Sequence, residues 1–198
     1  MERTYINEAR RAQIVRAAIG TIADLGYAKA SFAKITERAG LRSPRMISYH
    51  FADKEDLVRQ ILIEVFTLGA NYIAERMAQA GTALERFRAY LEANLEFLRE
   101  HPAEIAVLTE IGPHVRNEMG EHYTSASAQE ISVQGLEKLL SEGQTAGEFR
   151  EFDVRSMAVI VRGAVDGAAT RLREEPDFDF DAYTREVVTT FTLAVRRG

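Results

Sequence analysis

Residues that break helices are scarce along this chain. Only 4 prolines and 13 glycines are spread over 198 residues, and no Pro-, Gly- or Ser-rich linker gathers them. Between them, apolar residues recur with the period of an α-helix, whereas the alternation typical of a half-buried β-strand is scarce. Cysteine is absent, which excludes disulfide frameworks, Cys-zinc sites and thiol nucleophiles. The sequence therefore predicts an all-α fold held together by an apolar core alone.

Nine helices are expected, each delimited by a start or a stop residue. Gly26 ends the first helix, Ser31 is the expected N-cap of the second, and Ser43 followed by Pro44 begins the third. Thr82 opens a later helix as part of a capping box with Glu85, and Asp153 is the expected N-cap of the eighth helix. The expected ranges are 7–25, 32–39, 44–51, 54–80, 102–111, 119–145 and 154–175. The fifth helix follows Thr82, includes Leu84 to Leu98 and ends before Pro102, and the last helix begins after Asp177, Asp179 or Asp181 and reaches 197.

Charge is distributed unevenly along the chain. The net charge of −5 argues mildly against a nucleic-acid partner. However, residues 1–60 hold 11 Lys and Arg against 7 Asp and Glu, a net charge of +4, and the rest of the chain carries −9. A basic head on an acidic body indicates that only the head meets a polyanion.

The head, residues 1–58, is expected to form three short helices. The first presents an apolar stripe of Ile14, Ala18, Ile22 and Leu25. Gly40, between the second and third helices, allows the positive φ of a helix-turn-helix turn. The expected small core comprises Phe32, Ile35, Ala39, Leu41, Ile47 and Phe51. The third helix is left with an outward polar face that suits a major groove, made of Arg42, Ser43, Arg45, Met46, Ser48, Tyr49 and His50.

Three stretches of this region resemble the DNA-binding domain of the TetR family of regulators. They are Ile35-Thr36-Glu37-Arg38-Ala39-Gly40-Leu41, Ile47-Ser48-Tyr49-His50-Phe51 and Asp53-Lys54-Glu55-Asp56-Leu57. The family pattern runs approximately I-A-x-x-A-G-V, then Y-x-H-F or Y-H-F, then x-K-x-x-L. Thr36 and Arg42 depart from it, and one extra residue stands between Gly40 and Phe51. The start of the recognition helix is therefore left open.

The resemblance implies a DNA role for particular side chains. Phosphate contacts are implied for Tyr49, His50 and Lys54, and base contacts are expected from Arg45, Met46 and Ser48. Packing within the head is the open alternative for Tyr49, His50 and Met46. The complete expected DNA-binding set is Ser31, Lys34, Arg42, Ser43, Arg45, Met46, Ser48, Tyr49, His50 and Lys54.

The body, residues 59–198, is similar to the TetR family in its helical pattern and length. The resemblance implies a homodimer that reads a pseudo-palindromic operator, and a pocket for a small-molecule effector of unknown identity. We expect the last two helices to form the dimer interface. The pocket candidates, most of which also fit an ordinary core, are Phe66, Tyr72, Phe87, Tyr90, Phe97, Glu110, Met119, Tyr123, Phe149, Met157, Arg162 and Asp166. Acidic groups in the pocket would favour a cationic effector, and an inward Arg162 an anionic one.

Other functions find less support in the sequence. Glu118 and His122 have a metal-pair spacing but lack a third ligand, and no phosphate loop or nucleophile motif is present. No enzyme activity, cofactor, metal or membrane span is therefore expected. The interpretation is a cytoplasmic one-component transcriptional regulator, expected to be a repressor, although activation stays open. The alternative is a helical protein-binding module without DNA readout.

Overall fold

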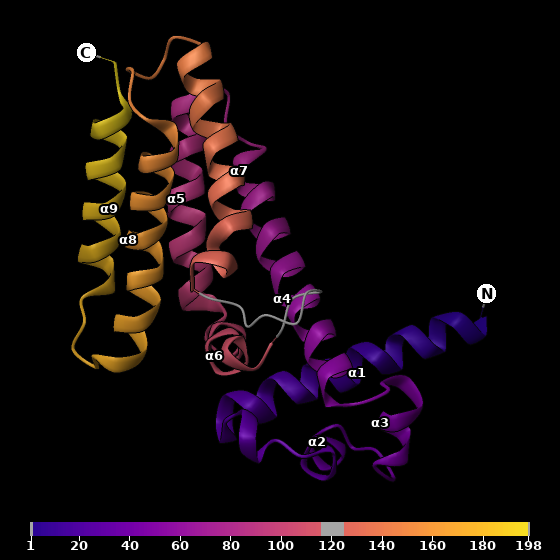
Figure 1. The fold of residues 1–198 in the computed structure, drawn as a ribbon. Coiled ribbons are helices and arrows are strands. Elements are labelled where there is room, and N and C mark those ends of the chain that lie inside the picture. The colour runs from indigo at the N-terminus through magenta and orange to yellow at the C-terminus, as the bar shows by residue number, and fades with distance from the viewer. Residues whose placement is uncertain (1, 116–124, 198) are drawn as a thin grey trace. The chain divides into compact units, whose positions relative to one another are not determined.

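The computed structural model describes residues 2–115 and 125–197. Within that part of the chain, Figure 1 shows helices joined by short connections and no strand, which confirms the all-α, nine-helix prediction. An isolated bridge joins Phe149 and Arg196. The elements are α1 (Glu2–Leu25), η1 (Tyr27–Lys29), α2 (Phe32–Arg38), α3 (Arg45–His50), α4 (Lys54–Met77), α5 (Ala83–Glu100), α6 (Pro102–Ile111), η2 (Gly112–His114), α7 (Ser125–Thr145), α8 (Val154–Glu174) and α9 (Phe180–Val195).

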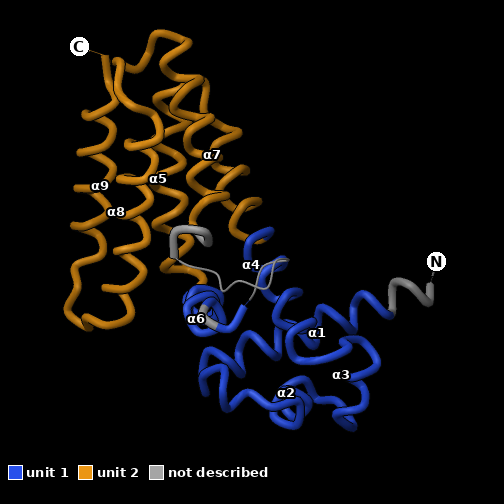
Figure 2. The backbone as a smooth tube through the Cα atoms, viewed as in Figure 1, with its two compact units in different colours: residues 1–67, 102–124 blue, residues 68–101, 125–198 orange. Residues whose placement is uncertain are grey.

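The chain divides into two compact units (Figure 2). Unit 1 comprises Met1–Thr67 and Pro102–Thr124, and unit 2 comprises Leu68–His101 and Ser125–Gly198. The division cuts α4 after Thr67 and assigns α6 to the N-terminal unit. These are units of packing, and the functional boundary at residue 58 stays a prediction.

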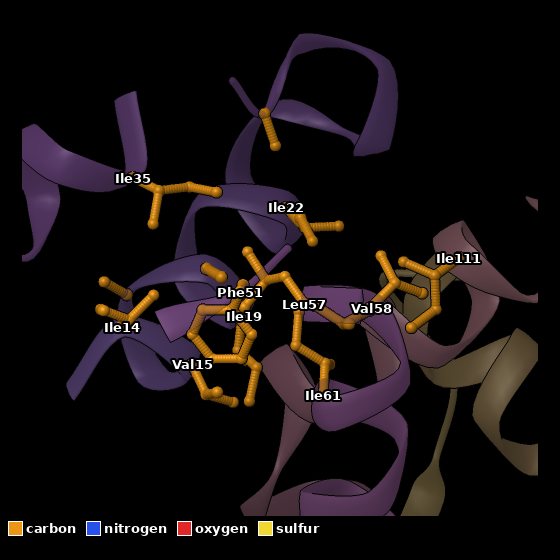
Figure 3. Close-up of a cluster of buried hydrophobic side chains, with 14 of the residues drawn as sticks. Ile14, Val15, Ile19, Ile22, Ile35, Phe51, Leu57, Val58, Ile61 and Ile111 are labelled. Atoms are coloured by element: carbon orange, nitrogen blue, oxygen red, sulfur yellow. The ribbon is translucent and has the colours of Figure 1, made fainter. Parts of the chain in front are cut away.

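Unit 1 has one apolar core, drawn in Figure 3. Ile14 and Ile22 of α1 are essentially fully buried in it, together with Ile47 of α3. From α6, Val107 and Ile111 enter the same core. A helix that lies more than forty residues beyond the head in sequence is therefore built into the head.

The helix starts follow the local chemistry of their capping residues. Thr82 and Glu85 form the expected capping box at α5. The Asp153 side chain accepts the Ser156 N–H at 2.7 Å and opens α8 as expected. Of the three candidate caps for the last helix, Asp179 is the one used, because its carboxylate accepts the Ala182 N–H at 2.8 Å.

Several helix boundaries, and the exposure of one residue, differ from what the sequence predicts. Helix α1 begins at Glu2 instead of residue 7, since no helix breaker precedes Asn7. Pro44, not Ser43, is the N-cap of α3, and the backbone carbonyl of Ser43 accepts the Met46 N–H at 3.1 Å. Leu25, at the end of the predicted stripe, is exposed. Residues 119–124 of the predicted seventh helix lie outside the described part of the chain.

Helix α4 combines sufficient length with an apolar composition. By length and composition it could cross a membrane, with a mean hydropathy of 1.2 over its best 18-residue window. Its first half, however, carries Leu57, Val58, Ile61 and Val65 into the core of unit 1. The composition of α4 is therefore weak evidence for a membrane span.

Unit 2 is a bundle of α5, α7, α8 and α9, which run side by side in Figure 1. Phe87 and Leu91 of α5 and Leu136 of α7 are completely buried in it. After α7, the ring of Phe149 packs against Gly143 so closely that a Cβ atom at position 143 would overlap it. The packing between α5 and α8 brings together the polar groups described below.

Candidate functional site

Helix α3 separates a buried face from an exposed face within six residues. Ile47 points into the core of unit 1 and is fully buried. Arg45 and Ser48 are exposed, and Tyr49 is 78% exposed. A large aromatic side chain left in solvent on a short helix loses the benefit of burial, so it is a candidate contact residue. The fully exposed members of the predicted face therefore lie where a groove-reading helix would present them.

Three other members of that predicted outward face are only half-exposed. Ser43, Met46 and His50 are partly buried, because they flank the inward face set by Ile47. Burial lowers the pKa of the His50 imidazole, and the nearby positive charges of Arg11 and Arg10 lower it further. His50 is consequently neutral near pH 7 in the free protein.

Arg11 of α1 holds the C-terminal end of α3 in place. Its guanidinium donates to the His50 carbonyl and, at 3.2 Å, to Oε1 of Gln60 on α4. The same group lies 4.4 Å from the centre of the Phe51 ring. On the same helix, Gln13 donates its Nε2 to the Ala39 carbonyl at 2.7 Å and so secures the end of α2. Neither residue was predicted from the sequence, and both are half-buried.

The start of α2 carries two of the expected DNA-binding residues. Ser31 is exposed, and its hydroxyl accepts the Lys34 N–H at 3.4 Å as an N-cap. The Lys34 side chain is exposed and borders a shallow depression of about 480 Å³ between α1 and α2. Arg42, between α2 and α3, is also exposed. These positive groups lie on the surface of the head, where a phosphate backbone can reach them.

Lys54 is held by Tyr27 instead of standing free at the surface. Its Nζ donates to the Tyr27 carbonyl at 2.7 Å and lies 3.9 Å from the centre of that ring. Burial lowers the pKa of Lys54. The Tyr27 N–H donates to Oε2 of Glu110 at 3.2 Å, and the Tyr27 ring stacks on His114 at 4.5 Å. Tyr27 thus links the start of α4 to α6 and η2 inside unit 1, and this is where the structure places Glu110, a predicted pocket residue.

In unit 2, the guanidinium of Arg162 on α8 donates hydrogen bonds to three polar side chains. Its Nη2 donates to Asp166 Oδ1 at 2.6 Å, and its Nη1 donates to Asn94 Oδ1 at 2.8 Å and to the Tyr90 hydroxyl at 3.4 Å. The side chain of Arg162 is 11% exposed and that of Asp166 is 33% exposed. We call these four residues the Arg162 cluster. Asn94 was missed by the sequence analysis, although a polar residue on the apolar face of α5 is the signal that could have revealed it.

The surroundings of the Arg162 cluster favour the charged form of Arg162, whereas burial disfavours the charged form of Asp166. Burial opposes the charge of Arg162, but Tyr90 and Asp166 outweigh it, and the net effect raises the pKa of Arg162. Burial also raises the pKa of Asp166, although the Arg162 guanidinium works in the opposite direction. The pair is therefore held as an ion pair with little solvent around the guanidinium.

The predicted aromatic pocket residues do not gather at one place. Phe87 and Phe149 meet each other with ring centres 5.9 Å apart and are buried in the core of unit 2. Tyr72 and Phe97 form another pair, 5.4 Å apart. Burial and a 2.8 Å hydrogen bond to Glu100 raise the pKa of Tyr72 to about 12.

The remaining pocket candidates are scattered. Phe66 is exposed on the part of α4 that belongs to unit 1, and Met157 of α8 is half-buried. Met119 and Tyr123, with Glu118 and His122, lie outside the described residues. Among the described residues, no three His, Asp or Glu side chains converge as a metal site requires. Of the predicted pocket residues that the structure describes, only Tyr90, Arg162 and Asp166 share one polar site.

Two family profiles cover most of the chain. The profile described as "Bacterial regulatory proteins, tetR family" matches residues 14–61, and "Tetracyclin repressor-like, C-terminal domain" matches residues 80–193. The chain belongs to the TetR family. It is a transcriptional regulator with an N-terminal helix-turn-helix and a ligand-binding C-terminal domain.

Relatives within the TetR family differ in how much of the chain they cover. The "Fatty acid metabolism regulator protein" of Bacillus subtilis is 24% identical over 89% of this chain and 90% of its own length. The "HTH-type transcriptional regulator BetI" of Cronobacter sakazakii is 32% identical over 52% of each chain. The chain thus spans about half the length of the BetI regulators that it matches.

Solved TetR-family structures share the fold. FadR from Bacillus subtilis, solved in complex with stearoyl-CoA, has a TM-score of 0.73 at 22% identity and covers 93% of this chain and 99% of its own. AibR, solved in complex with isovaleryl coenzyme A and operator DNA, has a TM-score of 0.74 at 19% identity and covers 91% and 97%. At these identities the likeness establishes the fold alone.

Proposed function

We propose that this TetR-family regulator is a cytoplasmic repressor that binds a pseudo-palindromic operator as a homodimer and is released by an acyl-CoA. The observation that carries the DNA-binding part is the division of α3 between buried Ile47 and exposed Arg45, Ser48 and Tyr49. One face anchors the helix, and the other has no place in the core of the head. In a major groove, Arg45 would read a guanine edge and Tyr49 would contact a phosphate.

The other expected DNA-binding residues fall into two groups. Ser31, Lys34 and Arg42 would contact phosphates at the edge of the recognition surface, where they are exposed. His50 and Lys54 are half-buried and tied to Arg11 and Tyr27 through backbone carbonyls. We therefore assign them a smaller share of the affinity, with Lys54 acting chiefly on the position of α4.

A homodimer is supported by apolar groups left in solvent on the last two helices. Val159 and Ile160 of α8 and Leu193 of α9 are all exposed. Nothing lies within 4 Å of a Cβ placed on Gly163, on the same helix as the first two. Apolar residues beside an open glycine allow a second copy to approach closely, and two recognition helices then read two half-sites.

An acyl-CoA effector is supported by the relatives and their solved complexes. The relative that covers most of this chain regulates fatty acid metabolism, and two structures of the same fold hold stearoyl-CoA or isovaleryl coenzyme A. Release would follow from a ligand that prefers a dimer unable to span both half-sites. The contact of Tyr27 with Glu110, His114 and Lys54 offers a route, since a shift of α6 would move the start of α4.

The proposal is tested by selecting binding sites from a random pool of duplex DNA. We expect an inverted repeat whose affinity falls steeply with salt, because phosphate contacts release counterions. The Tyr49→Ala variant should bind every site more weakly, and Arg45→Ala should lose preference at one base position per half-site. Arg88→Ala, which removes an exposed arginine of α5 in unit 2, is the matched control and should bind as the unmodified protein does.

The outcome separates the two candidate functions. Recovery of one asymmetric half-site would refute the dimer but keep the DNA-binding function. An absence of enriched sequence even at low salt would refute DNA readout and favour a helical protein-binding module. Loss of affinity in Arg88→Ala equal to that in Arg45→Ala would refute the assignment of α3 as the recognition helix.

A further inference from the structure

In unit 2, the Arg162 cluster brings together a buried cation, a carboxylate, an amide and a phenol. Arg162 reaches from α8 to two residues of α5, Tyr90 and Asn94, and to Asp166 one turn along its own helix. Asn94 is itself fixed, since its Nδ2 donates to the Tyr90 carbonyl at 2.7 Å. The cluster is therefore a preorganised polar site inside an apolar bundle.

Two polar atoms of the cluster make no hydrogen bond within the described part of the chain. They are the Nε–H donor of Arg162 and the Oδ2 acceptor of Asp166, and both atoms are buried. A buried polar group without a partner destabilises the folded protein, and more so when it is charged. One donor and one acceptor on a single ion pair therefore call for a partner that offers the opposite groups.

The charges of the site restrict the chemistry of that partner. Arg162 and Asp166 already neutralise each other at 2.6 Å. An added carboxylate would meet the carboxylate of Asp166, and an added ammonium would meet the guanidinium of Arg162. A hydroxyl group is uncharged, can accept from Nε–H, and can donate to Oδ2.

The exposed part of the cluster lies at Asp166. The Arg162 side chain is nine-tenths buried, but that of Asp166 is 33% exposed. Because Oδ2 of Asp166 and Nε of Arg162 are themselves buried, a ligand would approach from the Asp166 side and displace neighbouring side chains to reach both atoms. This arrangement gives a polar contact its strength, because solvent does not compete for the donor.

We infer that the Arg162 cluster is a specificity site for a hydroxyl group carried on the effector, so that the preferred ligand is a hydroxylated acyl-CoA. This inference rests on the proposed function, which supplies the acyl-CoA class. It adds that an unsubstituted acyl chain leaves Nε–H and Oδ2 unsatisfied and binds more weakly. A site built to hydrogen-bond a hydroxyl discriminates strongly against the analogue that lacks it.

The experiment uses dodecanoyl-CoA and a set of derivatives of the same chain length. The set carries a hydroxyl at carbon 3, a hydroxyl at carbon 12 or a carboxylate at carbon 12. Each ligand is titrated into the full-length protein by calorimetry and, separately, into its complex with the selected operator. We expect at least one hydroxylated ligand to bind about tenfold or more tightly than dodecanoyl-CoA, and the carboxylated ligand to gain nothing.

Variants test whether the preference comes from the cluster. Arg162→Lys keeps the positive charge but lacks Nε–H and the planar fork, and Asp166→Asn keeps the shape but halves the acceptor capacity. Both should reduce the ratio of the two affinities to about one, a readout that a merely structural role would not move. Arg155→Lys, on the same helix with Glu130 and Glu137 as partners, is the matched control and should keep the ratio. Operator affinity measured without ligand reports folding of each variant.

The outcomes distinguish this inference from the proposed function. Equal binding of hydroxylated and unsubstituted ligands by the unmodified protein overturns the inference and leaves the acyl-CoA proposal intact. A preference that survives in both Arg162→Lys and Asp166→Asn also overturns it. If no acyl-CoA binds while operator binding persists, the proposed effector class is wrong and the inference falls with it.

Discussion

The recognition surface of the head and the Arg162 cluster of the body use polar residues in opposite ways. On α3, Arg45 and Tyr49 face outward, and Ile47 is the residue of the helix that is buried in the core. On α8, Arg162 faces inward and is tied to two helices at once. In the head, the residue that holds α3 in the core and the residues proposed to contact DNA are different. In the body, Arg162 holds two helices together and is also the residue proposed to contact the effector.

This difference determines whether a mutation changes binding alone or changes binding and stability together. An exposed side chain can be removed with little effect on folding, so its loss reports binding. Removing one partner of a buried ion pair leaves the other charge buried without a partner. The replacement therefore lowers stability even in the absence of ligand. Ile47 and Tyr49 on α3 give the strongest test of whether folding and binding depend on separate residues. Arg162 and Arg155 on α8 give the next strongest test.

The largest effect is expected from the two neighbours on α3. Ile47→Ala should destabilise the protein by about 3 kcal/mol, because it empties a fully buried site in a packed core. Tyr49→Ala should change stability by less than about 0.5 kcal/mol while weakening operator binding. Urea unfolding and binding to the selected operator measure the two quantities. If Tyr49→Ala destabilised the protein as much as Ile47→Ala does, Tyr49 would be a packing residue and the separation in the head would fail.

In the body, a single replacement of Arg162 should change both the stability of the protein and the proposed binding of the effector. Arg162→Met should lower stability by about 3 kcal/mol, since Asp166 loses its partner while remaining partly buried. Arg155→Met, which removes an exposed arginine from the same helix, should leave the unfolding midpoint nearly unchanged. Thermal and urea unfolding test the pair. If Arg162→Met left the stability unchanged, water would satisfy Asp166. Arg162 would then contribute as little to stability as the exposed residues of α3 are expected to.

The same contrast explains which features were predictable from the sequence. Capping boxes, N-caps and the inward face of α3 depend on residues a few positions apart, so Thr82, Asp153 and Ile47 were predicted correctly. The cluster of Arg162 with Asn94 depends on how α5 packs on α8, because the two residues are 68 positions apart in the sequence. The docking of α6 into the head core is equally non-local. Local rules therefore predicted the fold class and the buried residue of α3, whereas the polar site of the body required the tertiary structure.

His50 is the intermediate case, half-buried in the head, and it gives the smallest expected effect. Its pKa in the folded protein is lowered from 6.5, by burial first and by Arg11 and Arg10 next. The unfolded chain therefore binds the proton more readily, so the contribution of His50 to stability is complete above about pH 6.5 and declines as the pH falls.

Operator binding should change in the opposite direction, because a nearby phosphate favours the protonated imidazole. Lowering the pH from about 7.5 to about 5.5 should strengthen binding through His50 by a few-fold, with an upper limit of tenfold per pH unit for one linked proton. The difference between the unmodified protein and His50→Gln isolates this term, since both retain His101, His114 and His122. Identical pH profiles of operator affinity would show that His50 does not contact phosphate. It would then belong, like Ile47, to the residues that only hold α3 in place.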